Sequence, residues 1–279
     1  MNKKYIAFTL CGATLVFLVT VTVIQTIAMF VSYDRGTNYF VEDAQLPTIA
    51  AILVFIGFFF AIAAACVIPK KNLKGSPFGL NLACALPATI GFLISAVFHL
   101  MEFVETRSML KLITAIFLTL AALYNFLTET NYGHTHAQTI ALLGFMPTTA
   151  CAFLIGSFYF DPSMEMNAPL KVFIQCALLV AMLYYTTELR YLIKRAIPRL
   201  YYALALCAMV AASLCMLSIP LATLFGVLRH PDYLTGSLTV LGIAITIALR
   251  AARYPTVAPQ KFLLPTQDNE NDPTKETAE

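Results

Sequence analysis

The chain has 279 residues, of which 59% are hydrophobic and only 12% are charged. A soluble domain carries roughly a quarter charged residues, so this composition excludes a globular fold with a water-facing surface and predicts a protein that uses lipid as its solvent. The formal charge of +3 is spread along the chain, which excludes a basic groove for nucleic acid and makes the lipid bilayer the expected partner.

Eight apolar segments are long enough to cross a bilayer as helices, because a span needs about 20 mainly apolar residues. They cover residues 5–32, 46–68, 78–101, 109–128, 137–160, 168–189, 199–227 and 233–252. The predicted fold class is therefore all-α, a polytopic integral membrane protein with its transmembrane domain over residues 1–254. Residues 255–279 are proline-broken and acidic, which predicts a disordered tail.

The loops between these segments differ in charge from one side to the other. Most of the lysines and arginines fall on one side if the chain starts in the cytoplasm, and lysine and arginine favour the cytoplasmic side of membrane proteins. Because the number of predicted spans is even, the C-terminus lies on the same side of the membrane as the N-terminus. The sequence predicts a cell-membrane protein with both termini, and the acidic tail, in the cytoplasm.

Residues 83–130 and 143–190 align without a gap when the chain is shifted by 60 positions. The shift pairs Pro87 with Pro147, Thr89 with Thr149, Glu105 with Glu165, Leu110-Lys111 with Leu170-Lys171, and Leu123-Tyr124 with Leu183-Tyr184. Each unit holds two spans, helices three and four or helices five and six. The sequence therefore predicts a parallel internal repeat whose copies are related by an axis along the membrane normal.

Pro87 and Pro147 are expected about 15 Å into helices three and five, near the midplane. Each proline lacks a backbone donor and frees a carbonyl one turn earlier, as in transporters whose broken helices surround a solute. The alternative is a pair of kinks that serve packing alone. The pattern favours a small permease or channel-like transporter for a neutral or amphipathic solute, with its site between helices three and five.

Six residues are candidates for the substrate site because they are the prolines and the deepest polar groups near them. They are Pro87, Thr89, Pro147, Thr149, Asn81 and Gln175. No acidic or basic residue lies in the middle of a predicted span, and coupling ions or charged substrates normally require one there. The expected solute is therefore uncharged.

The connector between helices six and seven is the densest cluster of positive charge and tyrosine in the chain. Its candidate contact residues for a partner or for anionic lipid are Glu188, Arg190, Lys194, Arg195 and Arg199. This basic loop supports the alternative function, a non-catalytic membrane scaffold, receptor or subunit.

Helix seven also carries a stripe of small residues, which predicts close packing within the bundle, in a homo-oligomer or against another membrane partner. The stripe consists of Ala203, Cys207, Ala208, Ala211, Ala212 and Cys215.

Metal and catalytic signals are weak. His99, Glu102 and Glu105 follow helical spacing, but a zinc site needs three or four ligands and a solvated helix end explains the pattern better. Ser108 and Lys111 match the S-x-x-K spelling without companion motifs, and Ser108 is also placed to cap helix four. No H-E-x-x-H, P-loop or G-x-S-x-G motif is present. The sequence predicts a non-enzymatic protein without metal or cofactor.

Overall fold

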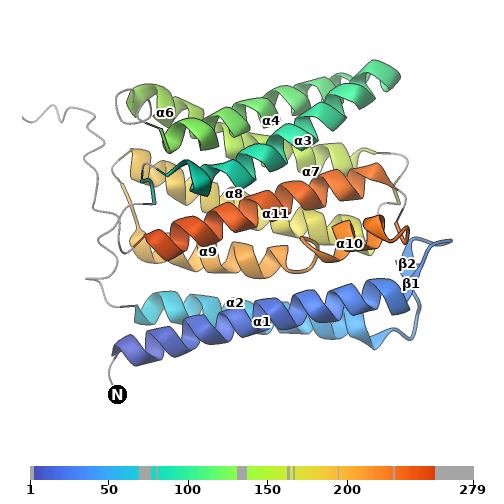
Figure 1. Ribbon diagram of the computed structural model, residues 1–279, viewed down its shortest axis with the longest axis horizontal. Helices are drawn as coiled ribbons and strands as arrows, with labels where there is room; N and C mark the ends of the chain where they lie inside the picture. Colours follow the sequence, from blue (N-terminus) through green and yellow to red (C-terminus); the bar gives the residue numbers. More distant parts are fainter. Residues whose placement is uncertain are drawn as a thin grey trace, which may run out of the picture.

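The computed structural model describes residues 3–68, 77–79, 81–130, 137–161, 164–165, 167–193, 195–228 and 230–254, with residues 3–8 and 137 described by their backbone alone. The predicted tail, residues 255–279, lies outside this set. The helices run along one common axis, and their ends form two opposite faces of a bundle (Figure 1).

The helices are α1 (Lys3–Val31), α2 (Gln45–Val67), α3 (Leu82–Thr106), α4 (Met109–Thr128), α6 (Ala137–Leu143), α7 (Met146–Tyr159), α8 (Pro169–Leu192), α9 (Pro198–Ala212), α10 (Ser218–Leu224) and α11 (Pro231–Arg253). Two short antiparallel strands, β1 (Tyr33–Asp34) and β2 (Tyr39–Phe40), pair Tyr33 with Phe40. We call the face with the first residue of α1 the N-terminal end of the bundle and the opposite face the hairpin end.

Seven segments within the described residues are long and apolar enough to cross a bilayer, with α6 and α7 forming one of them. Large apolar side chains face outward along them, as on α2, where Phe55 is 66% and Phe59 is 76% exposed. Exposed apolar surface of this extent is stable in lipid and not in water. The architecture is that of a multi-pass membrane protein, as the composition predicts.

The predicted seventh span, residues 199–227, is interrupted. It forms α9 and α10, and the turn between them begins at Ser213, whose hydroxyl donates to the Val210 carbonyl at 2.6 Å. Pro220 explains the restart, because a residue without an N–H is tolerated in the first turn of a helix but not in its interior. Of these two helices α9 is the longer. It has 15 residues, fewer than the about 20 residues that a membrane span needs.

Pro87 and Pro147 have different local structures. Pro87 lies inside α3, five positions after Leu82, about 8 Å from the helix start, so it is nearer the N-terminal end than the midplane depth that the sequence predicts. Pro147 lies in the first turn of α7, directly after a break between α6 and α7. One proline therefore interrupts a continuous helix and the other begins a new one.

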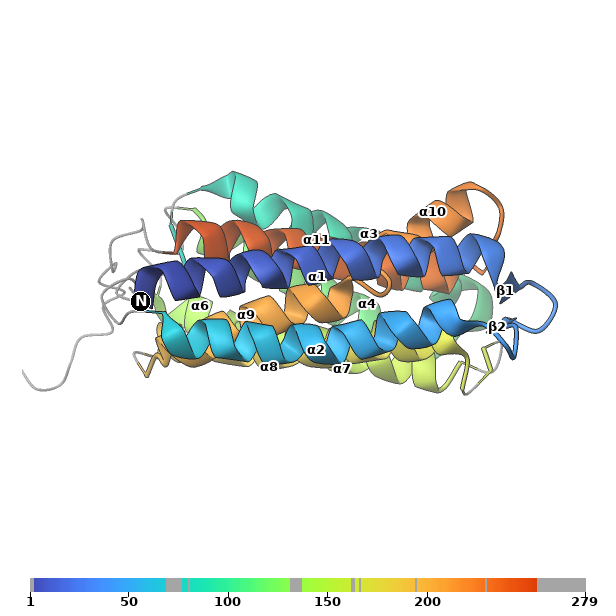
Figure 2. The same ribbon diagram turned by 90° about the horizontal axis from the view of Figure 1, so that it is seen from below.

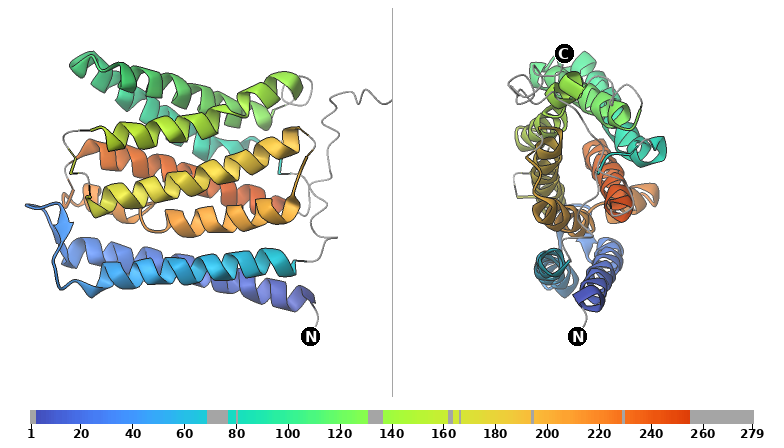
Figure 3. Two further views of the ribbon diagram at one scale, coloured as in Figure 1. Left: turned by 180° about the vertical axis from the view of Figure 1, so that it is seen from behind. Right: turned by 90° about the vertical axis from the view of Figure 1, so that its left-hand side faces the viewer.

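The α1–α2 hairpin forms one edge of the bundle, with β1 and β2 at its closed end (Figure 2). The end-on view in Figure 3 shows the pair beside α9. Val21 and Val54 pack there with Val210, and farther along Ala61 and Cys207 share a second contact. The small side chains of Ala61 and Cys207 allow a close approach of the helices at the second contact.

Helices α3 and α11 cross in close contact at Gly242. A Cβ on Gly242 would overlap the carbonyl oxygen of Pro87, so only glycine fits at this position. The Thr246 hydroxyl accepts a hydrogen bond from the Ala88 N–H at 3.0 Å, and the Thr239 hydroxyl donates to the Gly91 carbonyl at 3.1 Å. Threonines on α11 thus satisfy backbone groups near the proline of α3.

Candidate functional site

Arg250 is the largest fully buried side chain of the described residues, and it lies in the last turn of α11. All three guanidinium nitrogens donate hydrogen bonds. Nε donates to Glu129 Oε1 at 3.2 Å, Nη2 donates to Thr128 Oγ1 at 3.1 Å, and Nη1 donates to both oxygens of Glu188 at 2.7 and 3.0 Å. A guanidinium can be buried in this way because its donors and its charge are both matched.

The topology brings these residues together. Helices α4, α8 and α11 all end at the N-terminal end, with Glu129 capping α4, Glu188 in the last turns of α8 and Arg250 at the end of α11. The carbonyl ends of three helices therefore converge on one guanidinium. A cation is favoured there because each helix dipole is negative at its C-terminus.

Tyrosines complete the surroundings of Glu188. The Tyr184 hydroxyl donates to Glu188 Oε1 at 2.5 Å, and the Tyr124 hydroxyl donates to Oε2 at 3.4 Å. Tyr184 also shares a hydrogen bond with Tyr201 of α9, with the hydroxyl oxygens 2.9 Å apart. Glu188 thus receives donors from α4, α8 and α11.

Glu129 has a different environment. Besides Arg250, it accepts the backbone N–H groups of Gly79 at 3.1 Å and Asn81 at 3.5 Å, and the Phe78 ring lies 5.6 Å from the guanidinium carbon. Burial raises the pKa of the Glu129 carboxyl, while the positive charge of Arg250 and the Gly79 N–H act in the opposite direction. Glu129 and Glu188 with Arg250 form what we call the inner cluster.

A layer of tyrosines lies between the inner cluster and the N-terminal end. The Tyr201 and Tyr254 rings are stacked with centroids 5.4 Å apart, and the Tyr191 and Tyr254 hydroxyl oxygens are 2.6 Å apart. The Tyr202 hydroxyl donates to the Ala251 carbonyl at 2.6 Å. Burial raises the pKa of the Tyr254 phenol, which therefore stays neutral in the physiological range.

A second charged cluster lies at the hairpin end. Lys111 Nζ is 2.8 Å from Glu102, 3.3 Å from Asp161 and 4.0 Å from Asp232. Lys111 therefore lies within ion-pair distance of three acidic side chains, which come from α3, α11 and the segment after α7.

The predicted metal candidates separate in the structure. His99 is buried, with Nδ1 2.9 Å from the Ser95 carbonyl and Nε2 3.0 Å from the Ser157 hydroxyl. Glu102 pairs with Lys111, and Glu105 is exposed. Within the described residues there is no group of three or more His, Cys, Asp or Glu side chains that could hold a metal ion.

Each of the four polar candidates for the substrate site has a hydrogen bond to the backbone. The Thr89 hydroxyl donates to the Ala85 carbonyl at 3.0 Å, the Thr149 hydroxyl to the Phe145 carbonyl at 2.9 Å, and the Gln175 amide to the Ile155 carbonyl at 3.5 Å. Asn81 caps α3 by accepting the Ala83 N–H at 3.1 Å. These polar groups satisfy nearby backbone, and their predicted contact with a solute remains a prediction.

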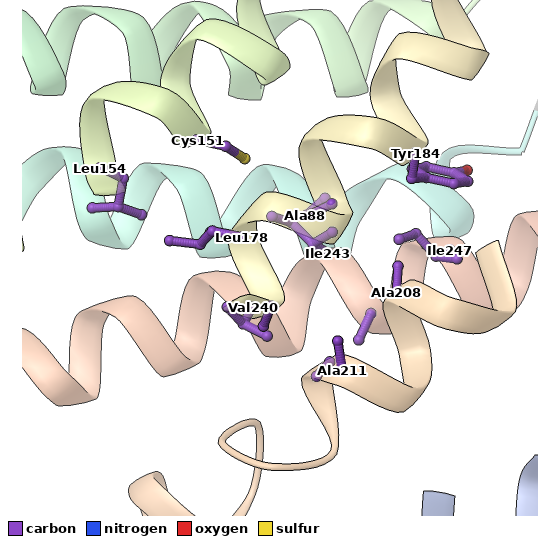
Figure 4. Packing of buried hydrophobic residues seen from close by; sticks show 14 of the residues in the cluster. Ala88, Cys151, Leu154, Leu178, Tyr184, Ala208, Ala211, Val240, Ile243 and Ile247 are labelled. Carbon is purple, nitrogen blue, oxygen red and sulfur yellow. The ribbon is translucent and has the colours of Figure 1, made fainter. Parts of the chain in front are cut away.

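The core beside the two prolines is filled by apolar side chains. Figure 4 shows Ala88, Cys151, Leu154, Leu178 and Ile243 in this part of the core.

Two cavities lie in other parts of the described structure. One, of about 490 Å³, is at the hairpin end and is lined by Arg35, Asn38 and His230 among others. The other, of about 330 Å³, is an apolar groove between α3 and α4 that faces the lipid side.

The predicted partner surface is only partly on the outside of the protein. Arg195 and Arg199 are exposed and Arg190 is half-buried, whereas Glu188 is fully buried in the inner cluster. Lys194 lies outside the described residues. The small-residue stripe of α9 is also used inside the chain, because Cys207 packs near Ala61.

Comparisons with protein-family models, with curated proteins and with solved structures found no match. The fold and the site together define the class of the protein, a multi-pass helical membrane protein with charged groups buried between its helices.

The sequence analysis did not predict that Arg250, Glu129 and Tyr124 form one site. The available signal was that Glu188 and Arg250 fall just inside the predicted spans 168–189 and 233–252, where a charge requires a partner.

Proposed function

We propose that this protein is a small permease or channel-like transporter for a neutral or amphipathic solute, and that its opening is controlled by the inner cluster. The observation that carries the proposal is a fully buried guanidinium held by carboxylates from two other helices. Ionisable groups inside a membrane are costly and commonly belong to substrate or ion pathways. A scaffold that does not move has less need of them.

The interrupted helices support the same proposal. The breaks before Pro147 and between α9 and α10 lie within otherwise membrane-length segments. Discontinuous helices of this kind allow one part of a transporter bundle to move against another. The apolar filling between α3 and α7 favours an uncharged solute over a charged one, and the described conformation is then a closed state.

We place the protein in the cell membrane. Its N-terminal end, with Arg195 and Arg199, then faces the cytoplasm. Two further contacts support the proposal that the protein is not an enzyme. The S-x-x-K lysine is engaged by carboxylates, and His99 is engaged by Ser95 and Ser157.

The proposal is tested with the full chain in lipid vesicles, by following vesicle swelling by light scattering after mixing with glycerol or urea. Vesicles with the wild-type chain are expected to swell several-fold faster than protein-free vesicles. The double variant Pro87→Ala with Pro147→Ala is expected to slow the swelling. Gly156→Ala is the matched control, because a Cβ there meets no atom within 4 Å. Equal rates in all four vesicle preparations would count against the proposal.

The second candidate function is a membrane scaffold, receptor or subunit that acts through the basic loop between α8 and α9. The exposure of Arg195 and Arg199 favours it. Purification in mild detergent is expected to retain a partner protein or anionic lipid with the wild-type chain and to lose it with Arg195→Glu plus Arg199→Glu. Arg35→Glu, an exposed change at the hairpin end, is the control. A wild-type protein without partner or lipid would exclude this function.

A further inference from the structure

The inner cluster holds more negative than positive charge. Glu129 is 4% exposed, Glu188 is 0% exposed and Arg250 is 1% exposed, so all three groups are removed from water. Two carboxylates face one guanidinium, and the cluster carries a charge of −1 if both are ionised.

The helix ends make this charge imbalance worse. The C-termini of α4, α8 and α11 meet at the inner cluster, and each contributes a negative partial charge. One carboxylate is balanced by Arg250, but the second adds negative charge to a site that already repels it. Charged groups that are buried without compensation generally take up a proton instead.

The hydrogen bonds decide which carboxylate takes the proton. Glu188 accepts a bidentate pair from Arg250 and two tyrosine hydroxyls, and such donors stabilise the ionised form. Glu129 accepts Arg250 Nε at the longer distance of 3.2 Å and two backbone N–H groups. Glu129 also caps α4, in the field of its C-terminus. Glu129 is therefore the weaker anion site of the two.

We propose that the inner cluster is a proton-binding site in which Glu129 carries the proton at neutral pH while Glu188 forms the close pair with Arg250. Proton uptake from a hydronium ion at the N-terminal end breaks one O–H bond of that ion, leaves a water molecule and forms one O–H bond on Glu129. The cluster charge changes from −1 to zero. The raised pKa of Glu129 agrees with this assignment.

The other titratable groups around Glu129 and Glu188 are tyrosines. Tyr185 of α8 is buried and close enough to interact with the charge of Glu188. Tyr124 faces Glu188 from α4, Tyr184 faces it from α8, and Tyr201 reaches it through Tyr184 from α9. From α11 the facing charge is Arg250, and residues 78–79 contribute the Phe78 ring and a backbone N–H. The proposed proton is therefore bound by one of the two carboxyl groups, Glu129, and the neighbouring groups hold the pair in place.

This inference goes beyond the proposed function, because a proton-binding site is a property at equilibrium that a scaffold would show equally. It is tested on the full chain in detergent by infrared spectroscopy of the protonated carboxyl band as a function of pH. The wild-type protein is expected to show a band that persists at neutral pH and titrates above the ordinary glutamate pKa of about 4.3. Glu129→Gln is expected to decrease this band, and any remaining part is expected to disappear with Asp232→Asn, because Asp232 is a second buried carboxyl group. Glu105→Gln, a change of an exposed carboxylate, is expected to leave the band unchanged.

Glu188→Gln supplies a second variant. It leaves Glu129 as the sole anion paired with Arg250, so the titration of Glu129 is expected to shift to lower pH. Absence of a protonated carboxyl band in the wild-type protein at neutral pH would overturn the proposal even if neither variant folds. A band that Glu129→Gln leaves undiminished would assign the proton to another residue and would also overturn the proposal. Neither result depends on vesicle swelling, so the two proposals fail separately.

Discussion

Tyr124 and Tyr184 both donate a hydrogen bond to the carboxylate of Glu188, although they lie on different helices. The two tyrosines are 60 positions apart and occupy the same place in the predicted repeat units 83–130 and 143–190. Equivalent positions of the two units thus meet at one group. The repeat itself remains a prediction, and Pro87 and Pro147, which also correspond, have different local structures.

The two tyrosine hydroxyls are expected to differ in their contribution to stability. Tyr184→Phe removes a 2.5 Å hydrogen bond to a buried carboxylate and should lower the free energy of unfolding by about 1.5–3 kcal/mol. Tyr124→Phe removes a 3.4 Å contact and should cost less than about 1 kcal/mol. Thermal unfolding in detergent measures both. An equal loss in the two variants would contradict the assigned geometry.

Loss of Arg250 alone should be more harmful than loss of the whole inner cluster. Arg250→Met leaves the buried Glu188 and Glu129 without their cation, and breaking such a pair costs about 3–5 kcal/mol. Adding Glu129→Met and Glu188→Met removes the uncompensated charges and should recover most of that loss. The yield of monodisperse protein and its denaturation midpoint distinguish the two cases. A triple variant as unstable as Arg250→Met would show that the charges are not the cause.

The crossing of α3 and α11 should depend on Gly242. A methyl group there overlaps the Pro87 carbonyl, so Gly242→Ala must separate the two helices and should destabilise the protein by about 1–3 kcal/mol. Gly156→Ala, in the open space of another helix, should be neutral or stabilising by up to about 1 kcal/mol. Thermal unfolding of the two variants side by side measures the difference. Equal effects would show that the close approach is unimportant.

The proposed orientation makes a direct prediction for labelling from outside the cell. In a background without the native cysteines, Arg35→Cys at the hairpin end should react with a membrane-impermeant maleimide on intact cells. Arg195→Cys at the N-terminal end should react only after the membrane is permeabilised. Both positions are exposed, so accessibility differs by side alone. The reverse pattern would invert the orientation.

The pH dependence of stability should reflect Glu129. A carboxyl whose pKa is raised on folding stabilises the folded protein at low pH, and that contribution is lost as the pH rises through the folded-state pKa. The wild-type protein should therefore lose stability as the pH increases from acid to alkaline. Glu129→Gln, which fixes a neutral side chain, should lose less over the same range. Parallel melting curves for the two proteins would contradict this expectation.

The amino-acid sequence alone determined which segments become helices in lipid. Apolar content, length and the positions of proline act locally, so seven membrane-length segments agree with predicted spans. The interruption of the predicted span 199–227 is also caused by local residues, Pro220 and the serines near it. It was not predicted, because a hydropathy average over the whole segment hides a short break. Helix ends differ from the prediction by several residues in α3, which covers Leu82–Thr106 and not 78–101.

Only the tertiary structure decided where the buried charges lie. Glu129, Glu188 and Arg250 are far apart in the sequence, and each is close enough to a helix end to be read as a solvated residue at the membrane surface. Their burial follows from three helices ending at the same level of the bundle. Pairing of charges depends on the distance between side chains of different helices, which neither local composition nor periodicity contains.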